Sequence, residues 1–292
     1  MKTGLPSELC LSVVIPCLDV ERLLPIQLEA LSSQSCPESW EVVVADNGSA
    51  DLTRQVAESF RIRFPELRVV FAHRRGRHHA CNAGARAARG KSLIFVDADD
   101  EVAPGYLAAM HRGLADHEFV GGRLEHQRMN APALWNVGNV QSDGLIDGLG
   151  FYPFVGGGNM GVSRRVFELV GGFRDKPYCE DIDFSWRAQL NGIHPVFLPD
   201  AVVHVRQRNS LRSMFLQHRR FGSAQALLYR DFRRNGMPMR SAADVARDWL
   251  AIGKSVAMLA VATPDERIRW TRRTARALGR LSGSLRHGVF YP

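Results

Sequence analysis

The hydrophobic pattern of the first hundred residues alternates between short apolar runs and segments with helical spacing. Apolar runs rich in β-branched residues, typical of buried strands, occur at residues 12–18, 41–45, 68–72 and 92–96. Helical spacing is found between them, at about residues 23–31, 52–60 and 79–89, and we expect Gly90 to cap the last helix. Near-continuous apolar strands separated by helices predict a parallel sheet covered on both faces. The pattern therefore predicts a doubly wound, Rossmann-like α/β unit.

Acidic residues follow two of these strands. Asp46 opens the segment DNGSAD (46–51) after the second strand, and Asp97, Asp99 and Asp100 follow the fourth. Ligands of such sheets bind in the crevice at the carboxyl ends of the strands, so we expect both clusters to face one crevice. Two structural roles stay open, because DNGS is also a good turn and an Asp at a strand end often caps the next helix.

Glycine-rich phosphate loops are absent from the sequence. The first strand is followed by CLDVE (17–21), which lacks GxGxxG, and no GxxxxGK[ST] motif occurs. This argues against a dinucleotide enzyme and against a P-loop NTPase. The Asp-x-Asp at 97–99 offers instead hard oxygen ligands for Mg²⁺ or Mn²⁺, which can bridge a diphosphate.

Six segments, taken in order and spacing, resemble those of bacterial family 2 glycosyltransferases with the GT-A fold. They are SVVIP (12–16), ADNGSAD (45–51), NAGARAARGKSLIFVDADD (82–100), GGGNMGVSRRVFELVGGF (156–173), CEDIDFSWRAQLNG (179–192) and PDAVVH (199–204). The resemblance covers about residues 11–205. It implies a GT-A catalytic domain over residues 1–208 and a basic helical region over 209–292. Within the domain it implies a nucleotide-sugar half at about 11–105 and an acceptor half at about 106–208.

The resemblance also implies roles for residues on the donor side. Asp46 would accept a hydrogen bond from the base N–H, which favours uridine or thymidine donors over guanosine. Asp97 would lie near the ribose and Asp99 on a divalent cation, Mg²⁺ or Mn²⁺. Arg77 would contact the base or a phosphate, although a solvated arginine is an equal alternative. His204 would complete the metal shell, although a lone histidine is usually a plain surface or core residue.

On the acceptor side the resemblance points to the pair Glu180-Asp181. In similar proteins the Asp of such a pair is the base that deprotonates the acceptor hydroxyl, which makes Asp181 the predicted catalytic residue and Glu180 an acceptor contact. Acids at a helix start also simply favour the helix dipole. Gly158 and Asn159 lie where the family places the acceptor, but the run of glycines before Asn159 also suits a flexible loop. The polar segment 125–150 suggests a loop that covers the site.

Composition and charge further limit the class of protein. The 292 residues are 45% hydrophobic and 23% charged, which excludes a fibrous or wholly disordered chain. The net charge of +8 is uneven, because residues 201–292 hold 18 basic and 5 acidic residues while residues 1–200 carry a net charge of −5. Five cysteines without a CxxC pair and a start unlike a signal peptide predict a cytoplasmic protein.

The basic region allows several interpretations. Its helical pattern includes an apolar run at 250–262, too short to span a bilayer, and an arginine-rich helix from about 265 to 287. Such a helix suits peripheral contact with an anionic membrane at the inner face, where a lipid-linked acceptor would be found. Alternatively, the helices pack on the body and the arginines are solvated. Nucleic-acid binding is not expected, because no recognition signature supports it.

Three classes of function follow from these observations. The first is a metal-dependent inverting glycosyltransferase with a nucleotide-diphosphate sugar donor and a saccharide, lipid-linked or small-molecule acceptor. The second is a glycoside hydrolase that uses paired carboxylates. The third is a non-catalytic basic adaptor for a membrane or a nucleic acid. The first explains both acidic clusters, the Glu-Asp pair and the missing phosphate-loop glycines together.

Overall fold

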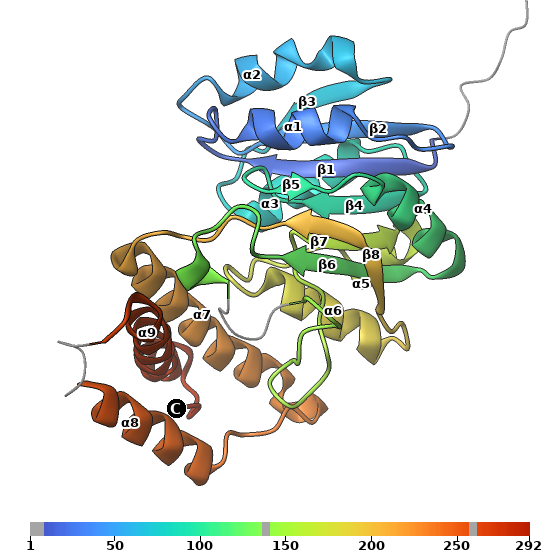
Figure 1. Cartoon of the computed structure of the whole chain (residues 1–292). Helices are drawn as coiled ribbons and strands as arrows, with labels where there is room; N and C mark the ends of the chain where they lie inside the picture. Colours follow the sequence, from blue (N-terminus) through green and yellow to red (C-terminus); the bar gives the residue numbers. More distant parts are fainter. Residues whose placement is uncertain (1–8, 136–140, 257–261) are drawn as a thin grey trace, which may run out of the picture.

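The computed structural model describes residues 9–135, 141–256 and 262–292 (Figure 1). The start of the chain, part of the predicted covering loop (136–140) and part of the apolar run (257–261) lie outside the described residues.

The predicted doubly wound unit is confirmed. Its four strands pair in parallel in the order β3-β2-β1-β4: β1 (Leu11–Cys17), β2 (Trp40–Asp46), β3 (Leu67–Phe71) and β4 (Ser92–Val96). They are connected through α1 (Leu24–Ser32), α2 (Thr53–Ser59) and α3 (Arg77–Ala87). The helix α3 ends before Gly90, so the expected capping role of this glycine is wrong. A Cβ on Gly90 would lie 2.6 Å from the backbone of Leu11 and of Ser12, so glycine is needed there for close approach to β1.

The second half of the sheet is mixed. β7 (Asn159–Ser163) pairs antiparallel with β4 and extends the sheet to the order β3-β2-β1-β4-β7-β6-β8-β5. The added strands are β5 (Glu101–Val102), β6 (Phe119–Glu125) and β8 (Val196–His204). The helices of this half are α4 (Tyr106–Asp116), α5 (Arg164–Val170) and α6 (Glu180–Leu190).

Successive side chains of the strands point to opposite faces of the sheet, and each face has its own hydrophobic core. Val13 and Ile15 belong to a core with residues of α1 and α4. Val14, between them, faces the opposite side and belongs to a core with residues of α3, α5 and α6. Because successive side chains of a strand point to opposite faces, the apolar runs are buried on both sides.

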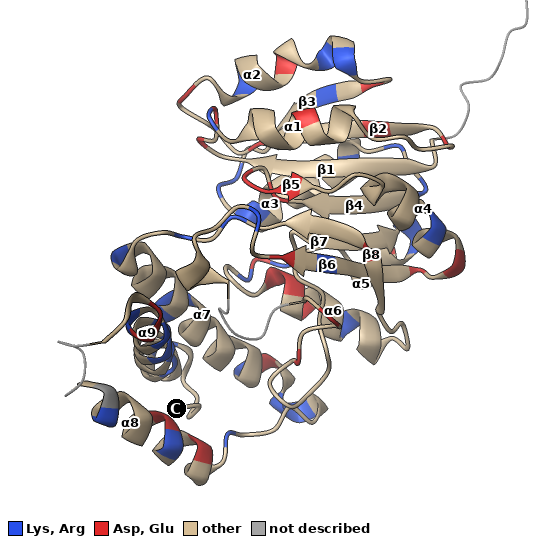
Figure 2. Cartoon of the chain, viewed as in Figure 1, with Lys and Arg blue, Asp and Glu red and all other residues tan. Residues whose placement is uncertain are grey.

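The basic region forms α7 (Leu211–Phe232), α8 (Ala242–Val256) and α9 (Pro264–His287). α7 and α9 pack backbone to backbone through glycines: a Cβ on Gly222 would overlap the carbonyl oxygen of Arg276, and one on Gly279 would overlap that of Arg219. Figure 2 shows basic residues along α9, with acidic residues on α8 and at the start of α6.

The helical region shares a core with the body. The fully buried Trp186 of α6 stacks edge-on against Phe232 of α7, with ring centroids 5.2 Å apart, and Tyr291 belongs to the same cluster. Of the interpretations left open for this region, packing on the body is therefore observed. No helix within the described ranges combines the length and apolarity needed to cross a bilayer.

Candidate active site

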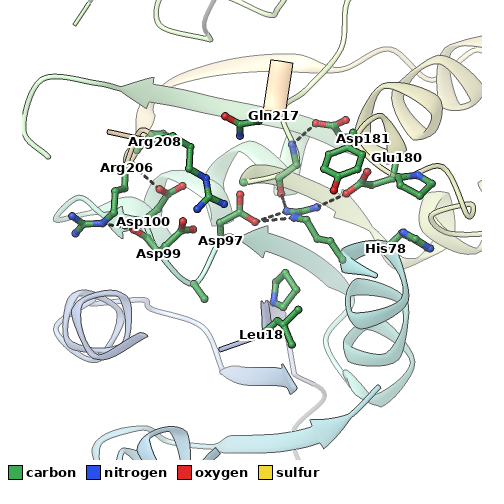
Figure 3. A pocket seen from close by; sticks show the side chains of 18 of the residues that line it. Leu18, His78, Asp97, Asp99, Asp100, Glu180, Asp181, Arg206, Arg208 and Gln217 are labelled. Atoms are coloured by element: carbon green, nitrogen blue, oxygen red, sulfur yellow. Dashed lines mark hydrogen bonds and ion pairs between the residues drawn. The ribbon is translucent and has the colours of Figure 1, made fainter. Parts of the chain in front are cut away.

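A cavity of about 800 Å³ lies where the ends of β1 and β4 meet the first turns of α3 and α6 (Figure 3). Its lining also includes residues 157–158, the segment 205–208 after β8, and residues of α7 and α9. The acidic residues of 97–100 and the pair Glu180-Asp181, far apart in the sequence, thus face one cavity.

Arg77 connects the acidic residues after β4 with the pair Glu180-Asp181 of α6. Its Nε and Nη2 donate to Oδ1 of Asp97 at 2.9 and 2.7 Å, and its Nη1 lies 3.6 Å from Oε1 of Glu180. It also donates to the carbonyl oxygen of Gly157 at 2.8 Å. Burial alone would lower the pKa of Arg77, but Asp97, Cys81 and Glu180 raise it well above the usual value. Arg77 is therefore a fixed charge between β4 and α6, and not a solvated arginine.

The carboxylates at the end of β4 repel one another. Burial raises the pKa of Asp99, and Asp97 raises it further. Burial, followed by the charges of Asp97 and Asp99, raises the pKa of Asp100 well above its usual range, although its Oδ1 accepts a hydrogen bond from the backbone N–H of Arg206 at 2.8 Å. Crowded carboxylate oxygens of this kind fit a divalent cation, which relieves their repulsion.

Asp181 lies at the first turn of α6 and lines the cavity. Its Oδ2 accepts a hydrogen bond from the backbone N–H of Gly157 at 3.0 Å, and its Oδ1 one from that of Ile182 at 2.8 Å. Burial, and then the neighbouring Glu180, raise its pKa to about 6, against the lowering effect of Arg77. Such a carboxylate is ionised at neutral pH and is still able to accept a proton.

Of the predicted acceptor contacts, Glu180 lines the cavity, and so does Gly158. A Cβ at this position would lie 2.7 Å from Oδ2 of Asp97. Since Asp97 is held by Arg77, glycine is required here to leave room for the carboxylate.

The prediction for Asp46 needs correction. Its side chain is only 1% exposed; Oδ1 accepts from the backbone N–H of Ser49 at 3.1 Å, and Oδ2 lies 3.5 Å from Nε of Arg54. The residue that lines the cavity is the next one, Asn47, whose Oδ1 accepts from the backbone N–H of Gly76 at 2.7 Å. Asp46 therefore stabilises the turn after β2, and it is Asn47 that faces the ligand space.

His204 and Asn159 also lie outside the cavity lining. Nδ1 of His204 is 2.7 Å from Oε2 of Glu125 on the adjacent strand β6, so this ring nitrogen already has a carboxylate partner. Asn159 is fully buried; its amide donates to Ala201 and accepts from the hydroxyl of Tyr106. Asn159 therefore holds strands together and is not an acceptor contact.

The helical wall of the cavity was not predicted from the sequence. It consists of residues from α7, α9 and the segment after β8: Arg206, Gln207, Arg208, Gln217, His218, Phe221, Arg272 and Arg276. The sequence carried one signal, the four-residue spacing of Arg272 and Arg276, which places both on one face of a helix. That spacing alone does not say which face packs inward.

The chain belongs to glycosyl transferase family 2, whose family model matches residues 12–171. The model described as glycosyl transferase family group 2 matches residues 93–264. The family predicted from the six segments is thereby confirmed.

Curated relatives match shorter stretches. The chain is similar to validoxylamine A glucosyltransferase of Streptomyces hygroscopicus subsp. limoneus, with 39% identity over 118 residues, 38% of this chain and 26% of the relative. It is also similar to an uncharacterized glycosyltransferase of Bacillus subtilis, with 42% identity over 88 residues, 30% of this chain and 22% of the relative. The matched stretches thus span about a quarter of these relatives.

Solved structures show the same fold over more of the chain. A mannosyltransferase from Pyrobaculum calidifontis in complex with GDP-Man and Mn²⁺ superposes with a TM-score of 0.67 at 22% identity, covering 94% of this chain and 87% of that one. Glucosyl-3-phosphoglycerate synthase from Mycobacterium tuberculosis, in complex with Mn²⁺, UDP and glucosyl-3-phosphoglycerate, gives 0.54 at 21% identity, covering 79% and 81%. These likenesses confirm the predicted fold class.

Proposed function

We propose that this protein transfers a sugar from a nucleotide-diphosphate sugar to an acceptor hydroxyl with inversion, with Asp181 as the general base. One observation carries the proposal: Asp181 and the carboxylates at the end of β4 line a single cavity. A donor on one side and an acceptor hydroxyl on the other would meet between them.

The chemistry at Asp181 follows from its two hydrogen bonds. The N–H groups of Gly157 and Ile182 fix the orientation of the carboxylate and leave lone pairs for an acceptor hydroxyl. As the acceptor oxygen bonds to the anomeric carbon, its proton passes to Asp181. The bond from that carbon to the diphosphate breaks, and the diphosphate leaves with the electron pair. No covalent enzyme intermediate is required.

The leaving diphosphate needs positive charge near the end of β4. Asp99, with Asp97 or Asp100, would hold a Mg²⁺ or Mn²⁺ ion, which would supply Lewis-acid stabilisation of the leaving group. The Asp99 carboxylate accepts a hydrogen bond from its own backbone N–H, which leaves further lone pairs for a cation. Arg206 and Arg208 line the cavity beside this cluster and would add fixed charge.

The identity of the base is left open in this proposal. The preference for uridine or thymidine rested on Asp46, whose side chain is buried away from the cavity. The solved neighbours hold GDP-Man in one case and UDP in the other, so both classes of donor deserve a test. A cytoplasmic location and peripheral contact with a membrane stay predictions.

Two competing functions lose support. Membership of the glycosyl transferase family favours transfer over hydrolysis by a carboxylate pair. The adaptor hypothesis depended on a separate basic tail, whereas α7 packs against α6 in a shared core.

Calorimetric titration with UDP, TDP and GDP, each with Mn²⁺ and with EDTA, tests the donor side. We expect metal-dependent binding of one nucleotide, lost in Asp99→Ala and kept in Asp200→Ala, the same change at an exposed aspartate outside the cavity. Folded protein that binds none of the three would overturn the proposed donor class.

A further inference from the structure

Two consecutive histidines of α3 and an aspartate after α5 bring three metal-binding side chains together. His78 and His79 lie in the first turn of α3, and Asp175 lies in the segment 171–179, which connects α5 with α6. One ligand atom from each of the three side chains lies within 4.8 Å of the other two. Two imidazoles and a carboxylate are a typical ligand set for a divalent transition metal.

The contact between His78 and Asp175 is close but is not aligned as a hydrogen bond. Nε2 of His78 lies 3.0 Å from Oδ1 of Asp175, and this buried nitrogen has no hydrogen-bond partner in the described ranges. The side chain of His78 is only 4% exposed, so bulk water does not solvate the nitrogen either. Two ligands at a right angle on one ion, with bonds of about 2.1 Å, are also about 3 Å apart. The carboxylate oxygen is therefore placed as a second ligand would be.

The backbone around α3 holds this arrangement. Gly76, just before the helix, has a φ of +131°, and a Cβ there would lie 2.6 Å from Cε1 of the His78 ring, so glycine is required. One turn after His78, on the same face of α3, Asn82 exchanges two hydrogen bonds with the backbone of Phe173, at 2.7 and 3.0 Å. The segment that carries Asp175 is thus already anchored to the face on which His78 lies.

The charge state of the three side chains suits a cation. Burial lowers the pKa of His78 and outweighs the attraction of Asp175, while burial and then His78 lower the pKa of His79. Both rings are therefore neutral at pH 7, as a metal ligand must be. Arg74 donates to Oδ2 of Asp175 at 3.3 Å, which leaves Oδ1 for an ion. Its side chain is 74% exposed, so solvent screens its charge.

The group lies apart from the carboxylates after β4. Figure 3 shows His78 on the Glu180 side of the cavity and Asp99 on the opposite side. The ligand atoms differ as well, because the residues after β4 offer only oxygen, which suits Mg²⁺ or Mn²⁺, whereas imidazole nitrogen suits Zn²⁺. The two places would therefore take ions of different chemistry.

We infer that His78, His79 and Asp175 bind a Zn²⁺ ion that holds the segment before α6 against α3. Zn²⁺ in proteins is usually four-coordinate, so water would complete the shell. The ion would fix the segment that leads directly into the first turn of α6. This site goes beyond the proposed function and does not depend on it, since none of its three ligands has a role there.

Zinc binding is measured in the full-length chain, freed of metal with EDTA and kept without nucleotide. Every protein in the series carries Asp99→Ala, so that the cation site proposed after β4 does not contribute. Calorimetric titration with Zn²⁺ gives the affinity and the stoichiometry, and the visible absorption of Co²⁺ reports the geometry of the shell. We expect one Zn²⁺ per chain, with no competition from Mg²⁺.

Two matched pairs of variants locate the ion. His79→Ala should weaken Zn²⁺ binding at least roughly tenfold, because even the loss of a group outside the coordination shell has an effect of this size. His117→Ala, at an exposed histidine outside the cavity, should bind like the parent. Asp175→Asn removes the charged ligand and should weaken binding, whereas Asp200→Asn should not. Circular dichroism of each variant is compared with that of the parent.

The results decide whether the ion is bound at this site. A folded parent that binds no Zn²⁺ overturns the inference, and so does equal binding by His79→Ala and His117→Ala, which would mean adventitious binding only. Zn²⁺ should also raise the Tm of the parent and leave that of Asp175→Asn unchanged; an equal rise in both contradicts the site. Because nucleotide is absent throughout, failure here is distinguishable from failure of the proposed donor.

Discussion

The backbone N–H of Gly157 donates to Oδ2 of Asp181 across 3.0 Å, which ties the loop before β7 to the first turn of α6. This hydrogen bond favours the ionised carboxylate, whereas burial and Glu180 favour the protonated form and prevail. The result is an oriented base with a raised pKa, and the following predictions start from it.

Asp181→Asn should lose transfer while keeping nucleotide binding. Asparagine preserves the shape of the side chain but accepts no proton, so we expect the rate to fall by about 10²- to 10⁴-fold. Initial rates and nucleotide titration measure the two effects separately, with Asp200→Asn as the control. A rate equal to that of wild type would show that another group is the base.

The rate should depend on pH through Asp181. Its pKa of about 6 predicts that kcat/KM falls below pH 6, with a slope of about one log unit per pH unit, since only the ionised carboxylate is a base. Arg77 lowers this pKa, so Arg77→Gln should move the acid limb to higher pH. An acid limb that stays in place in Arg77→Gln would contradict this electrostatic coupling.

The ionised Asp181 should also lower the free energy of unfolding at neutral pH. The folded pKa of about 6 lies above the unfolded value of 3.8, so the folded state holds its proton more tightly and loses stability as the pH rises from about 4 to 6. Asp181→Asn removes this cost. We expect its free energy of unfolding to exceed that of wild type by roughly 1 to 3 kcal/mol above pH 6.

Chemical denaturation at pH 4 and pH 7.5 checks this prediction. The gain should fall to well below 1 kcal/mol near pH 4, where the folded state carries the proton and the unfolded state carries it in part. A gain of equal size at both pH values would have another origin.

Gly158→Ala should weaken metal-dependent nucleotide binding. The added Cβ would lie 2.7 Å from Oδ2 of Asp97, and the two hydrogen bonds from Arg77 prevent that carboxylate from yielding freely. We expect roughly tenfold weaker binding, a little over 1 kcal/mol. Gly144→Ala is the control, because an added Cβ there meets no atom within 4 Å. Similar affinities for the two variants would mean that the Asp97 position does not matter for the donor.

Alanine substitution at two helical glycines should change the stability of the fold in opposite directions. Gly279→Ala would push α9 against the carbonyl oxygen of Arg219 on α7, which should destabilise the fold by about 1 to 3 kcal/mol. Gly253→Ala in α8 meets no atom within 4 Å and should stabilise by roughly 0.5 to 1 kcal/mol through helix propensity. Thermal unfolding of both variants gives the comparison; a harmless Gly279→Ala would contradict the close helix contact.

Sequence reasoning located the strands and the acidic segment 97–100 because both follow from local patterns. Apolar runs mark the strands, and residues that follow parallel strands must gather at one edge of the sheet. The placement of Asp97, Asp99 and Asp181 in one cavity followed from these rules and the family resemblance.

The errors arose where side-chain direction depends on tertiary contacts. At the end of β2 the buried Asp46 and the cavity-lining Asn47 are consecutive residues, and the sequence does not show which of the two faces the ligand. His204 lies outside the cavity lining, with its Nδ1 against Glu125, which is 79 residues away in the chain. Asn159 is engaged by Tyr106 and Ala201, again from distant segments. The helical wall depends on how α7 meets α9, which no local pattern encodes.

Tyr291 packs in the same buried cluster as Trp186, so this core is complete only after residue 291 has been synthesised. Tyr291 is 1% exposed and shares its cluster with residues of α6 and α7, while α9, which precedes it, carries Arg272 and Arg276. During synthesis the strands β1–β4 and residues 97–100 leave the ribosome first, and domains form as their segments emerge. The nascent chain can thus form the first strands of its sheet well before α9 and Tyr291 are added, and the helical wall is completed only after these later residues have emerged.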